Sequence, residues 1–266
     1  MDNPCHREDR RWGSDYRDEK AQAIFETLQM VAGPSIAEGC WLDIGCGSGG
    51  IATALAPKVR RMVGVDPEPW SRWDEVGRPA GVVFHVGSYE DLPALLGDES
   101  VEVVVCNQVY EHVASAAQLI EAIARVLKPG GVCYFAGPNL LWPIEPHVHW
   151  PFVHWLPRRI AQSLMKGLGS RRAQELDAYS AHCLKLRGWF ALHGLKPRTA
   201  LRERIVAGLR QRGWVAWAEA VNAVPSVVIS ALEPIAPGFV FILTKPDRTK
   251  GVTMASGHTR EGLRDD

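Results

Sequence analysis

The residues whose types and spacing could do chemistry begin in a glycine-rich turn, Leu42-Asp43-Ile44-Gly45-Cys46-Gly47-Ser48-Gly49-Gly50. Glycines adopt backbone angles closed to other residues and let a ligand approach the main chain, and free N–H groups at a following helix start favour negative ligand groups. The turn therefore predicts a nucleotide site. Asp43, two residues before the first glycine, adds a carboxylate that suits a ligand carrying a positive charge.

The same turn leaves a second interpretation open. Gly45, Gly47 and Gly50 also satisfy G-x-G-x-x-G, and Asp66 lies at about the distance expected of the acidic residue that takes a ribose hydroxyl in dinucleotide folds. A nicotinamide-dependent oxidoreductase is thus an alternative. Asp43 speaks against it, because a pyrophosphate gains nothing from an extra negative charge.

Short apolar runs that alternate with helical patterns must position these residues. We expect strands near 40–44, 61–65, 82–86, 101–106 and 132–136, then a strand at 195–201, a helix at 202–212 and a last strand at 239–244. Such alternation predicts a mostly parallel sheet with helices on both faces, and ligands of such sheets bind at the carboxyl ends of the strands. The candidate residues fall at those ends.

With these landmarks in order, the chain resembles the class I S-adenosylmethionine-dependent methyltransferases over about 39–139. The motifs that carry the resemblance are the glycine turn and the segments 63–66, 87–93, 107–113 and 125–131. The resemblance implies an α/β fold, namely a Rossmann-like seven-stranded methyltransferase sheet with helices on both faces and an antiparallel last strand. The residues after Asn139 depart from the minimal core: an aperiodic loop at 142–157 and a helical pattern from 158 to about 192 predict a lid insertion between strands 5 and 6. The resemblance also implies S-adenosylmethionine as the cofactor.

By resemblance, Asp43 and the main chain of the glycine turn hold the methionine end of the cofactor, and Asp66 takes both ribose hydroxyls. Ser88 stands where the family often has an Asp that contacts the adenine amino group, so this contact is expected to be weaker or to pass to the main chain of Tyr89. The implied cofactor-binding set is Asp43, Gly45, Cys46, Gly47, Asp66, Pro67, Ser88, Tyr89, Asn107 and Gln108.

A metal is not expected. In some related ubiquinone-pathway O-methyltransferases, a Glu three positions before a Glu-His pair helps to bind a divalent cation, but Gln108 occupies that position here, and an amide poorly replaces a carboxylate for a hard cation. The spacing Glu145-x-His147-x-His149 could also suggest a metal. It lies in a proline-broken loop with no further obvious ligand.

Methyl transfer from a sulfonium is an in-line displacement, so the protein mainly aligns the nucleophile in a water-poor cavity. A hydroxyl acceptor also benefits from a base, and we rank His112 first, then His149 and His147; each could instead hold a loop by hydrogen bonding. The substrate-binding candidates are Glu111, Trp142, Glu145, Trp150, Phe152 and Trp155. The aromatic ones would line an apolar pocket or pack a lid onto the core.

The length and composition suit one α/β domain with an insertion. With the resemblance, we expect a single methyltransferase domain over 1–245, with an N-terminal helix at 17–33, a lid and substrate insertion at 141–194, and a disordered tail at 246–266. The 266 residues are 46% hydrophobic, and 30 Lys and Arg balance 30 Asp and Glu, so nucleic acid is not an expected partner. Six cysteines without metal-ligand spacing and a charged start without an apolar signal favour the cytoplasm.

Two segments raise the question of membrane contact. The segment 221–243 is almost free of polar side chains, but Pro225, Pro234 and Pro237 break it, so we expect a short helix, a turn and a buried strand. The segment 158–172 is cationic and amphipathic, which suggests peripheral membrane contact and a lipid-linked acceptor. An ordinary solvated helix is the alternative.

The sequence thus predicts an S-adenosylmethionine-dependent methyltransferase that acts on a small-molecule or lipid-linked acceptor, at a hydroxyl oxygen. Transfer to nitrogen or carbon remains an alternative of the same class. Outside that class, the sequence leaves open the nicotinamide-dependent oxidoreductase and a non-catalytic cofactor-binding partner protein, whose signature would be cofactor binding without an acceptor pocket.

Overall fold

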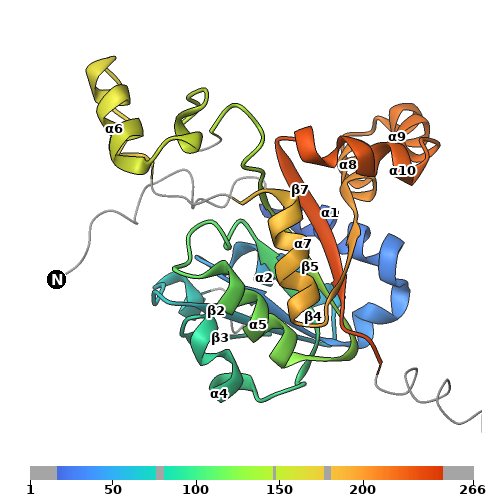
Figure 1. Ribbon diagram of the computed structural model, residues 1–266. Coiled ribbons are helices and arrows are strands. Elements are labelled where there is room, and N and C mark those ends of the chain that lie inside the picture. Colours follow the sequence, from blue (N-terminus) through green and yellow to red (C-terminus); the bar gives the residue numbers. More distant parts are fainter. Residues whose placement is uncertain (1–16, 76–80, 146–147, 177–180, 248–266) are drawn as a thin grey trace, which may run out of the picture.

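A computed structural model describes residues 17–75, 81–145, 148–176 and 181–247. Its centre is a seven-stranded sheet in the order β3-β2-β1-β4-β5-β7-β6 (Figure 1). The strands are β1 (Cys40–Ile44), β2 (Arg61–Asp66), β3 (Val82–Val86), β4 (Val101–Asn107), β5 (Leu127–Pro138), β6 (Lys196–Thr199) and β7 (Gly238–Thr244). Strands β1 to β5 pair in parallel, and β7 is antiparallel to both neighbours. The predicted fold class and the antiparallel last strand are confirmed.

Helices cover both faces of the sheet (Figure 1). Apolar residues of α1 (Arg17–Ala32) and α2 (Gly50–Leu55) pack on one face, and those of α5 (Ala116–Val126) and α7 (Cys183–Leu192) pack on the other. The remaining helices are η3 (Pro34–Glu38), η4 (Ala56–Lys58), η5 (Tyr89–Asp91), α4 (Leu92–Leu96), η6 (Val153–Trp155), α6 (Arg158–Gly167), η7 (Ala173–Glu175), α8 (Leu201–Gln211), α9 (Val215–Asn222), α10 (Ser226–Leu232) and η8 (Glu233–Ile235).

The alternation of side chains along β1 decides which face each residue serves. Leu42 and Ile44 join the core layer beneath α5 and α7, whereas Trp41 joins the layer beneath α1 and α2. Because successive strand residues point to opposite faces, Asp43 shares the face of Trp41. The carboxylate of the glycine-turn motif is therefore directed toward α1.

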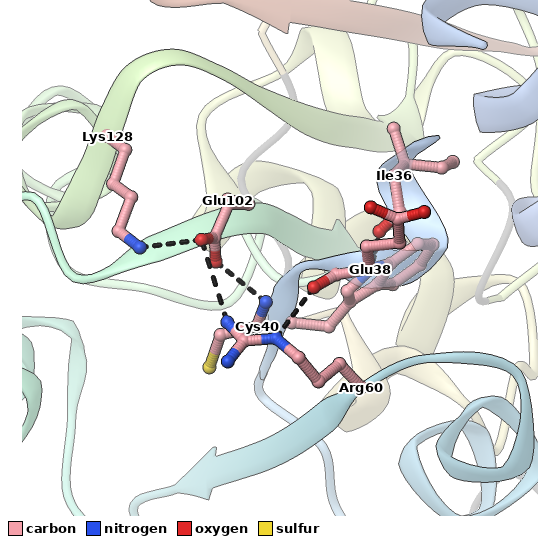
Figure 2. Close-up of polar contacts among 7 residues, drawn as sticks. Ile36, Glu38, Cys40, Arg60, Glu102 and Lys128 are labelled. Carbon is pink, nitrogen blue, oxygen red and sulfur yellow. Dashed lines mark hydrogen bonds and ion pairs between the residues drawn. The ribbon is translucent and has the colours of Figure 1, made fainter. Parts of the chain in front are cut away.

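A polar cluster fixes the end of the sheet where β1 and β4 begin (Figure 2). Glu102 accepts hydrogen bonds from Lys128 Nζ at 2.6 Å and from the Cys40 N–H at 2.7 Å, and the Arg60 guanidinium lies 3.8 Å away. Arg60 Nε also donates to the Glu38 carbonyl at 2.6 Å. Burial opposes the charge of Glu102, but these donors hold its pKa below the ordinary value.

The insertion after β5 carries its own small core. Buried Val148, Val153, Ala161, Met165, Ala173 and Leu176 pack together there, apart from the two layers of the sheet. The expected aperiodic loop at 142–157 contains one 3-10 helix, η6, and an isolated bridge between Ile144 and Pro151. In Figure 1, α6 stands clear of the sheet and of the helices that cover it.

Three boundaries differ from the expectations. β5 covers Leu127–Pro138 instead of 132–136, because a register shift absorbs Lys128-Pro129-Gly130-Gly131: Leu127 pairs with Val101 and Val132 with Val103. β6 is shorter than the strand predicted at 195–201. The helical pattern after Arg158 is divided between α6 and α7.

The apolar segment 221–243 contains α10, η8 and β7, as expected of a short helix, a turn and a buried strand. Within the described ranges, no single helix is long and apolar enough to cross a membrane. One pair, Val215–Asn222 with Ser226–Ile235, passes that test jointly but is bent by 91°.

Candidate functional site

The glycine turn joins β1 to α2 through three residues in the left-handed region, with φ of +65° at Gly45, +52° at Gly47 and +83° at Gly49. Two of them also leave no room for a side chain. A Cβ on Gly45 would lie 2.7 Å from Val109, and one on Gly49 would lie 2.5 Å from Phe84. The turn therefore needs glycine for its conformation and for its packing.

Asp66, at the carboxyl end of β2, holds this turn in place. Its Oδ2 accepts a hydrogen bond from the Gly47 N–H at 2.8 Å, and its Oδ1 accepts from Glu68 N–H at 3.1 Å and from Trp70 Nε1 at 3.3 Å. Trp73 Nε1 donates to the Gly47 carbonyl at 2.8 Å. Both polar groups of the Gly47 main chain are thus fixed from the neighbouring strand and its loop.

A cavity of about 410 Å³ opens at the carboxyl ends of β1, β2 and β4. Seven of the predicted site residues line it: Gly45, Asp66, Pro67, Ser88, Tyr89, Gln108 and His112. Ile44, Val65, Glu68, Trp70, Gly87, Val109 and Val113 complete the lining. Apolar walls with a few convergent polar groups are typical of a small-molecule or cofactor site.

Asp43 lies behind the glycine turn and is only 3% exposed. Its Oδ2 has no hydrogen-bond donor among the described residues. Burial raises the pKa of Asp43 to about 7; the positive charge of Arg17 works against this rise and the negative charge of Asp66 adds to it. The positive charges of Arg17 and Lys20 thus act on this carboxylate, but its Oδ2 has no hydrogen bond from the described residues, which is a condition in which a cationic ligand group can add stabilisation.

Gln108 and His112 border the cavity from the loop after β4. Gln108 adopts a positive φ of +60°, which is uncommon for a residue with a side chain, and its N–H donates to Ala136 O at 2.9 Å. The His112 side chain is 34% exposed, and its Nε2 lies 4.0 Å from Oε1 of the fully buried Glu111. The partly exposed imidazole of His112 can therefore accept a proton from a molecule bound in the cavity, or donate one to it.

Tyr110 fastens this loop to the rest of the fold. Its hydroxyl donates to the Pro138 carbonyl and accepts from the Ala181 N–H at 3.1 Å, so the loop after β4, the end of β5 and the start of α7 meet at one buried side chain. These hydrogen bonds also fix the backbone of the same loop at Gln108 and His112. A positive φ that the surroundings hold in place is typical of functional loops.

Ser88 and Tyr89 come from the turn after β3. The Ser88 hydroxyl accepts from the Glu90 N–H at 3.1 Å, and the Asp91 carboxylate accepts from the Ser88 N–H at 2.8 Å, which together form a capping box for η5. The Tyr89 hydroxyl donates to Gln118 Oε1 at 3.4 Å. The hydroxyl and the N–H of Ser88 are thus both engaged within the turn, so the main chain of Tyr89 stays the predicted contact for the adenine.

The other predicted cofactor residues lie next to the cavity without lining it. Cys46 is buried, and burial with the nearby carboxylates of Asp43 and Asp66 raises the pKa of its thiol well above the ordinary value, so the side chain is a neutral filler. Gly47 contributes its bonded main chain, and Asn107 ends β4. Their predicted contacts with the cofactor stay predictions.

The predicted substrate residues are not gathered at this cavity. Glu111 is fully buried beside His112. Glu145 is 2% exposed and accepts from the Val148 N–H at 2.6 Å, so it stabilises its own loop in this structure. Phe152 and Trp155 pack on each other with ring centroids 5.0 Å apart. None of the six candidates, which also include Trp142 and Trp150, is among the lining residues.

Of the three predicted bases, only His112 lines the cavity. His149 is exposed on a turn with φ of +58°, and His147 lies outside the described residues. A histidine that the sequence reasoning passed over, His154, has its Nε2 within 2.8 Å of Trp142 O and 3.1 Å of Leu140 O. It holds the insertion loop together, which is the role considered for each histidine.

Sequence reasoning missed Trp70 and Glu68, which line the cavity, and Arg17 and Lys20 of α1, which face Asp43. The positions of the first two directly after Asp66 could have suggested them, because the loop that follows a ligand-binding strand end is part of the same edge. No sequence signal links α1 to β1. In the described ranges, no group of three or more His, Cys, Asp or Glu side chains is arranged to hold a metal ion.

The fold and the cavity together define the general class of protein. A doubly wound sheet with a glycine turn after β1, an acidic residue at the end of β2 and a cavity at the carboxyl ends is an α/β nucleotide- or cofactor-binding domain. Residues 42–135 match the family described as the methyltransferase domain. This match, the sheet order and the motifs together show that residues 42–135 belong to a methyltransferase domain of the class I S-adenosylmethionine-dependent type.

Relatives that share part of this chain include named methyltransferases, and solved structures share its fold. The chain is 33% identical over 123 residues to the uncharacterized methyltransferase YcgJ of Bacillus subtilis (44% of this chain, 48% of the relative). It is 32% identical over 102 residues to a ubiquinone biosynthesis O-methyltransferase of Hydrogenovibrio crunogenus (37% and 42%), and 29% identical over 139 residues to a dimethylglycine N-methyltransferase of Parasynechococcus marenigrum (47% and 49%).

Each of these alignments spans less than half the length of the relative. The crystal structure of YcgJ superposes with a TM-score of 0.51 at 17% identity, over 84% of this chain and 99% of that one. The [4+2]-cyclase SpnF superposes with a TM-score of 0.53 at 15% identity, over 86% and 81%. At such identities the structures show the shared fold, and they do not decide the reaction.

Proposed function

We propose that this protein transfers a methyl group from S-adenosylmethionine to a small-molecule or lipid-linked acceptor, at a hydroxyl oxygen. The observation that carries the proposal is the pairing of two features at one edge of the sheet. Asp43, buried behind the glycine turn, has an Oδ2 without a donor in the described chain, and His112 lies on the wall of the neighbouring cavity.

The residues present fit the cofactor. Its positively charged amino and sulfonium groups suit the edge where Asp43 and Asp66 lie, and its ribose hydroxyls suit the Asp66 carboxylate, which has about four acceptor positions. Three of these already accept bonds, and the contact from Trp70 Nε1 is the longest at 3.3 Å. Two ribose hydroxyls would therefore be accommodated if Trp70 gives way. The bound cofactor supplies an electrophilic methyl group.

His112 is the residue that we assign to the acceptor proton. A neutral imidazole can accept a proton near pH 7, and the Glu111 carboxylate at 4.0 Å can orient the ring and stabilise the positive charge that it gains. The apolar lining contributed by Val109 and Val113 on the same loop excludes water from the acceptor. For the adenine, the main chain of Tyr89 is the proposed contact, because the Ser88 hydroxyl caps η5 and the Ser88 N–H donates to Asp91.

The cofactor is tested by calorimetric titration of the purified protein with S-adenosylmethionine and, separately, with NAD, repeated on Asp43→Ala and Asp66→Ala. We expect S-adenosylmethionine to bind and NAD not to bind, with both substitutions weakening the interaction. Binding of NAD alone would overturn the methyltransferase proposal in favour of the oxidoreductase.

The acceptor atom is tested with a panel of phenols, alcohols and amines and with the variant His112→Gln. Loss of a general base lowers turnover by roughly 100- to 10,000-fold, so we expect the transfer rate to fall while the cofactor affinity stays the same. Transfer to amines that is insensitive to His112→Gln would favour nitrogen methylation, as in the name of the dimethylglycine relative. Cofactor binding without transfer to any acceptor would favour a non-catalytic partner protein.

A further inference from the structure

The α6 face is an apolar surface on the insertion that the cavity does not use. Its six large side chains, Phe152, Trp155, Leu156, Ile160, Leu164 and Leu168, are each at least 39% exposed. Three of them, Ile160, Leu164 and Leu168, recur every fourth residue and so form one stripe along α6. None belongs to the lining of the cavity.

The stripe is not a by-product of a loosely held helix. Ala161 and Met165, on the adjoining side of α6, are fully buried in the small core with Val148 and Val153. Ala161 and Met165 therefore already pack α6 onto the insertion. The stripe of Ile160, Leu164 and Leu168 is additional apolar surface that this packing does not use. Contiguous exposed apolar patches of this kind mark interaction sites.

The charge around the stripe identifies the kind of partner. From Val148 to Arg172 the sequence contains Arg158, Arg159, Lys166, Arg171 and Arg172 but no Asp or Glu, although the whole chain has equal numbers of cations and anions. Arg159, Lys166 and Arg171 are exposed. A positive segment within a neutral protein is complementary to an anionic surface, and its long side chains can carry their charges past the apolar stripe.

We infer that the α6 face docks the protein onto an anionic lipid surface. The stripe enters the boundary between headgroups and acyl chains, the cations of α6 contact lipid phosphates, and Trp155 and Phe152 lie at the level where aromatic rings are favoured. The docking goes beyond the proposed methyl transfer and does not depend on it. It would bring the insertion that follows β5, and with it the site edge of the sheet, to a lipid-linked molecule (Figure 1).

A second exposed apolar surface, formed by α9 and α10, serves as a comparison. Trp217, Val227, Leu232 and Ile235 are exposed there, but the sequence contains no Lys or Arg from Gly213 to Thr244. The nearby arginines of α8 are engaged with this surface itself: Arg210 pairs with Glu219 at 2.7 Å, and Arg202 donates to the Val224 carbonyl at 3.1 Å. Equal changes to its apolar side chains therefore test whether α6, and not exposed apolar area in general, binds the membrane.

The experiment is co-sedimentation of the full chain with vesicles of phosphatidylcholine alone or mixed with phosphatidylglycerol, at low and high salt. We expect binding to the anionic vesicles only, weakening as salt screens the charges. Arg159→Gln with Lys166→Gln and, separately, Ile160→Ser with Leu164→Ser should each lower the binding at least tenfold. S-adenosylmethionine affinity, measured on the same samples, should not change because α6 lies outside the cavity.

The matched controls are Lys58→Gln with Arg61→Gln, which removes two exposed charges beside the start of β2, and Val227→Ser with Leu232→Ser on α10. Both should bind vesicles like the unmodified chain. Three results would each overturn the inference: no binding at low salt, equal loss with the Lys58 and Arg61 control, or loss with the α10 variant while the α6 variants still bind. The salt dependence of the unmodified chain tests the inference without any substitution.

Discussion

Two carboxylates, one near each end of strand β1, lie in opposite electrostatic surroundings. Glu102, next to Cys40 where the strand begins, accepts bonds from Lys128 and from the Cys40 N–H (Figure 2). Asp43, near the other end, is buried, and no donor in the described ranges reaches its Oδ2. The pKa of Glu102 is lowered and that of Asp43 is raised to about 7.

The difference indicates where to look for function in this fold. A carboxylate whose charge the protein already matches stabilises the folded chain, because removing it leaves the Lys128 and Cys40 donors without an acceptor. A buried carboxylate whose charge is not matched costs free energy until a cation arrives. We therefore assign Glu102 to the structure and Asp43 to the cofactor, and four predictions test this division.

The largest effect is expected from Asp43→Asn. Hydrogen bonds to charged groups contribute about 1.5–3 kcal/mol, so removing the charge should weaken S-adenosylmethionine binding by about 10- to 100-fold. The free energy of unfolding at neutral pH should stay the same or rise, because the amide is cheaper to bury than a charge. Calorimetric titration and urea unfolding measure the two quantities.

The matched control for this substitution is Glu102→Gln, which removes a carboxylate from the same sheet without touching the cavity. It should bind the cofactor like the unmodified chain. Equal losses of affinity in both variants would show that the sheet as a whole, and not the charge of Asp43, governs binding, and the division between the two carboxylates would then fail.

The second prediction concerns the pH dependence of cofactor affinity. A cationic ligand binds the ionised form of Asp43, and a pKa of about 7 means that this form grows from about a tenth of the free protein at pH 6 to about nine tenths at pH 8. Affinity should therefore rise about tenfold over this range, with release of a proton on binding. Titration in buffers of different ionisation enthalpy measures the proton.

Asp43→Asn should remove most of this pH dependence, since the amide does not titrate. A tenfold rise that persists in the variant would have to come from another group near the cofactor, such as His112 on the cavity wall. In that case the raised pKa of Asp43 would have no part in binding.

Much of the fold could be predicted because its signals are local. The strands at 40–44 and 82–86 were predicted to the residue, since each is a short apolar run ended by a glycine or a polar turn. The start of β5 was missed. Pro129 and the two glycines after it are typical of a turn, and only pairing with β4 shows that they form an irregular part of a strand.

The candidate site could be predicted where residues follow strand ends and could not where contacts depend on packing. Asp66, Gln108 and His112 were found because the carboxyl ends of parallel strands meet at one edge. The surroundings of Asp43 depend on how α1 crosses the sheet, which periodicity does not fix. The aromatic residues of the insertion were expected at a pocket or in packing, and those described pack within the insertion.

The third prediction is a loss of stability in Glu102→Gln. The Glu102 carboxylate contacts the Lys128 ammonium, the Cys40 N–H and the Arg60 guanidinium. Its side chain is 33% exposed, however, so solvent screens the ion pairs. We expect the free energy of unfolding in urea to fall by about 1 kcal/mol. Glu38→Gln is the control, because Arg60 contacts the carbonyl and not the side chain of Glu38. A loss as large in that control would assign the effect to surface charge in general.

The fourth prediction, which separates the two carboxylates by sign, is the pH dependence of stability. Asp43 holds its proton in the folded chain up to about pH 7, whereas its ordinary pKa is 3.8, so its burial lowers stability increasingly as pH rises between these values. Glu102 has a lowered pKa, so its contribution is present above its ordinary 4.5 and disappears as pH falls through the lowered value.

Urea unfolding of the unmodified chain, Asp43→Asn and Glu102→Gln from about pH 4 to pH 8 should therefore give two different curves. The stability of Asp43→Asn relative to the unmodified chain should climb as pH rises toward 7 and then level off. That of Glu102→Gln should be low and flat above about pH 4.5 and should recover as the solution becomes more acid than this. Curves of the same sign would mean that both carboxylates are matched by the protein alone, which would leave the glycine turn without a reserved charge for the cofactor.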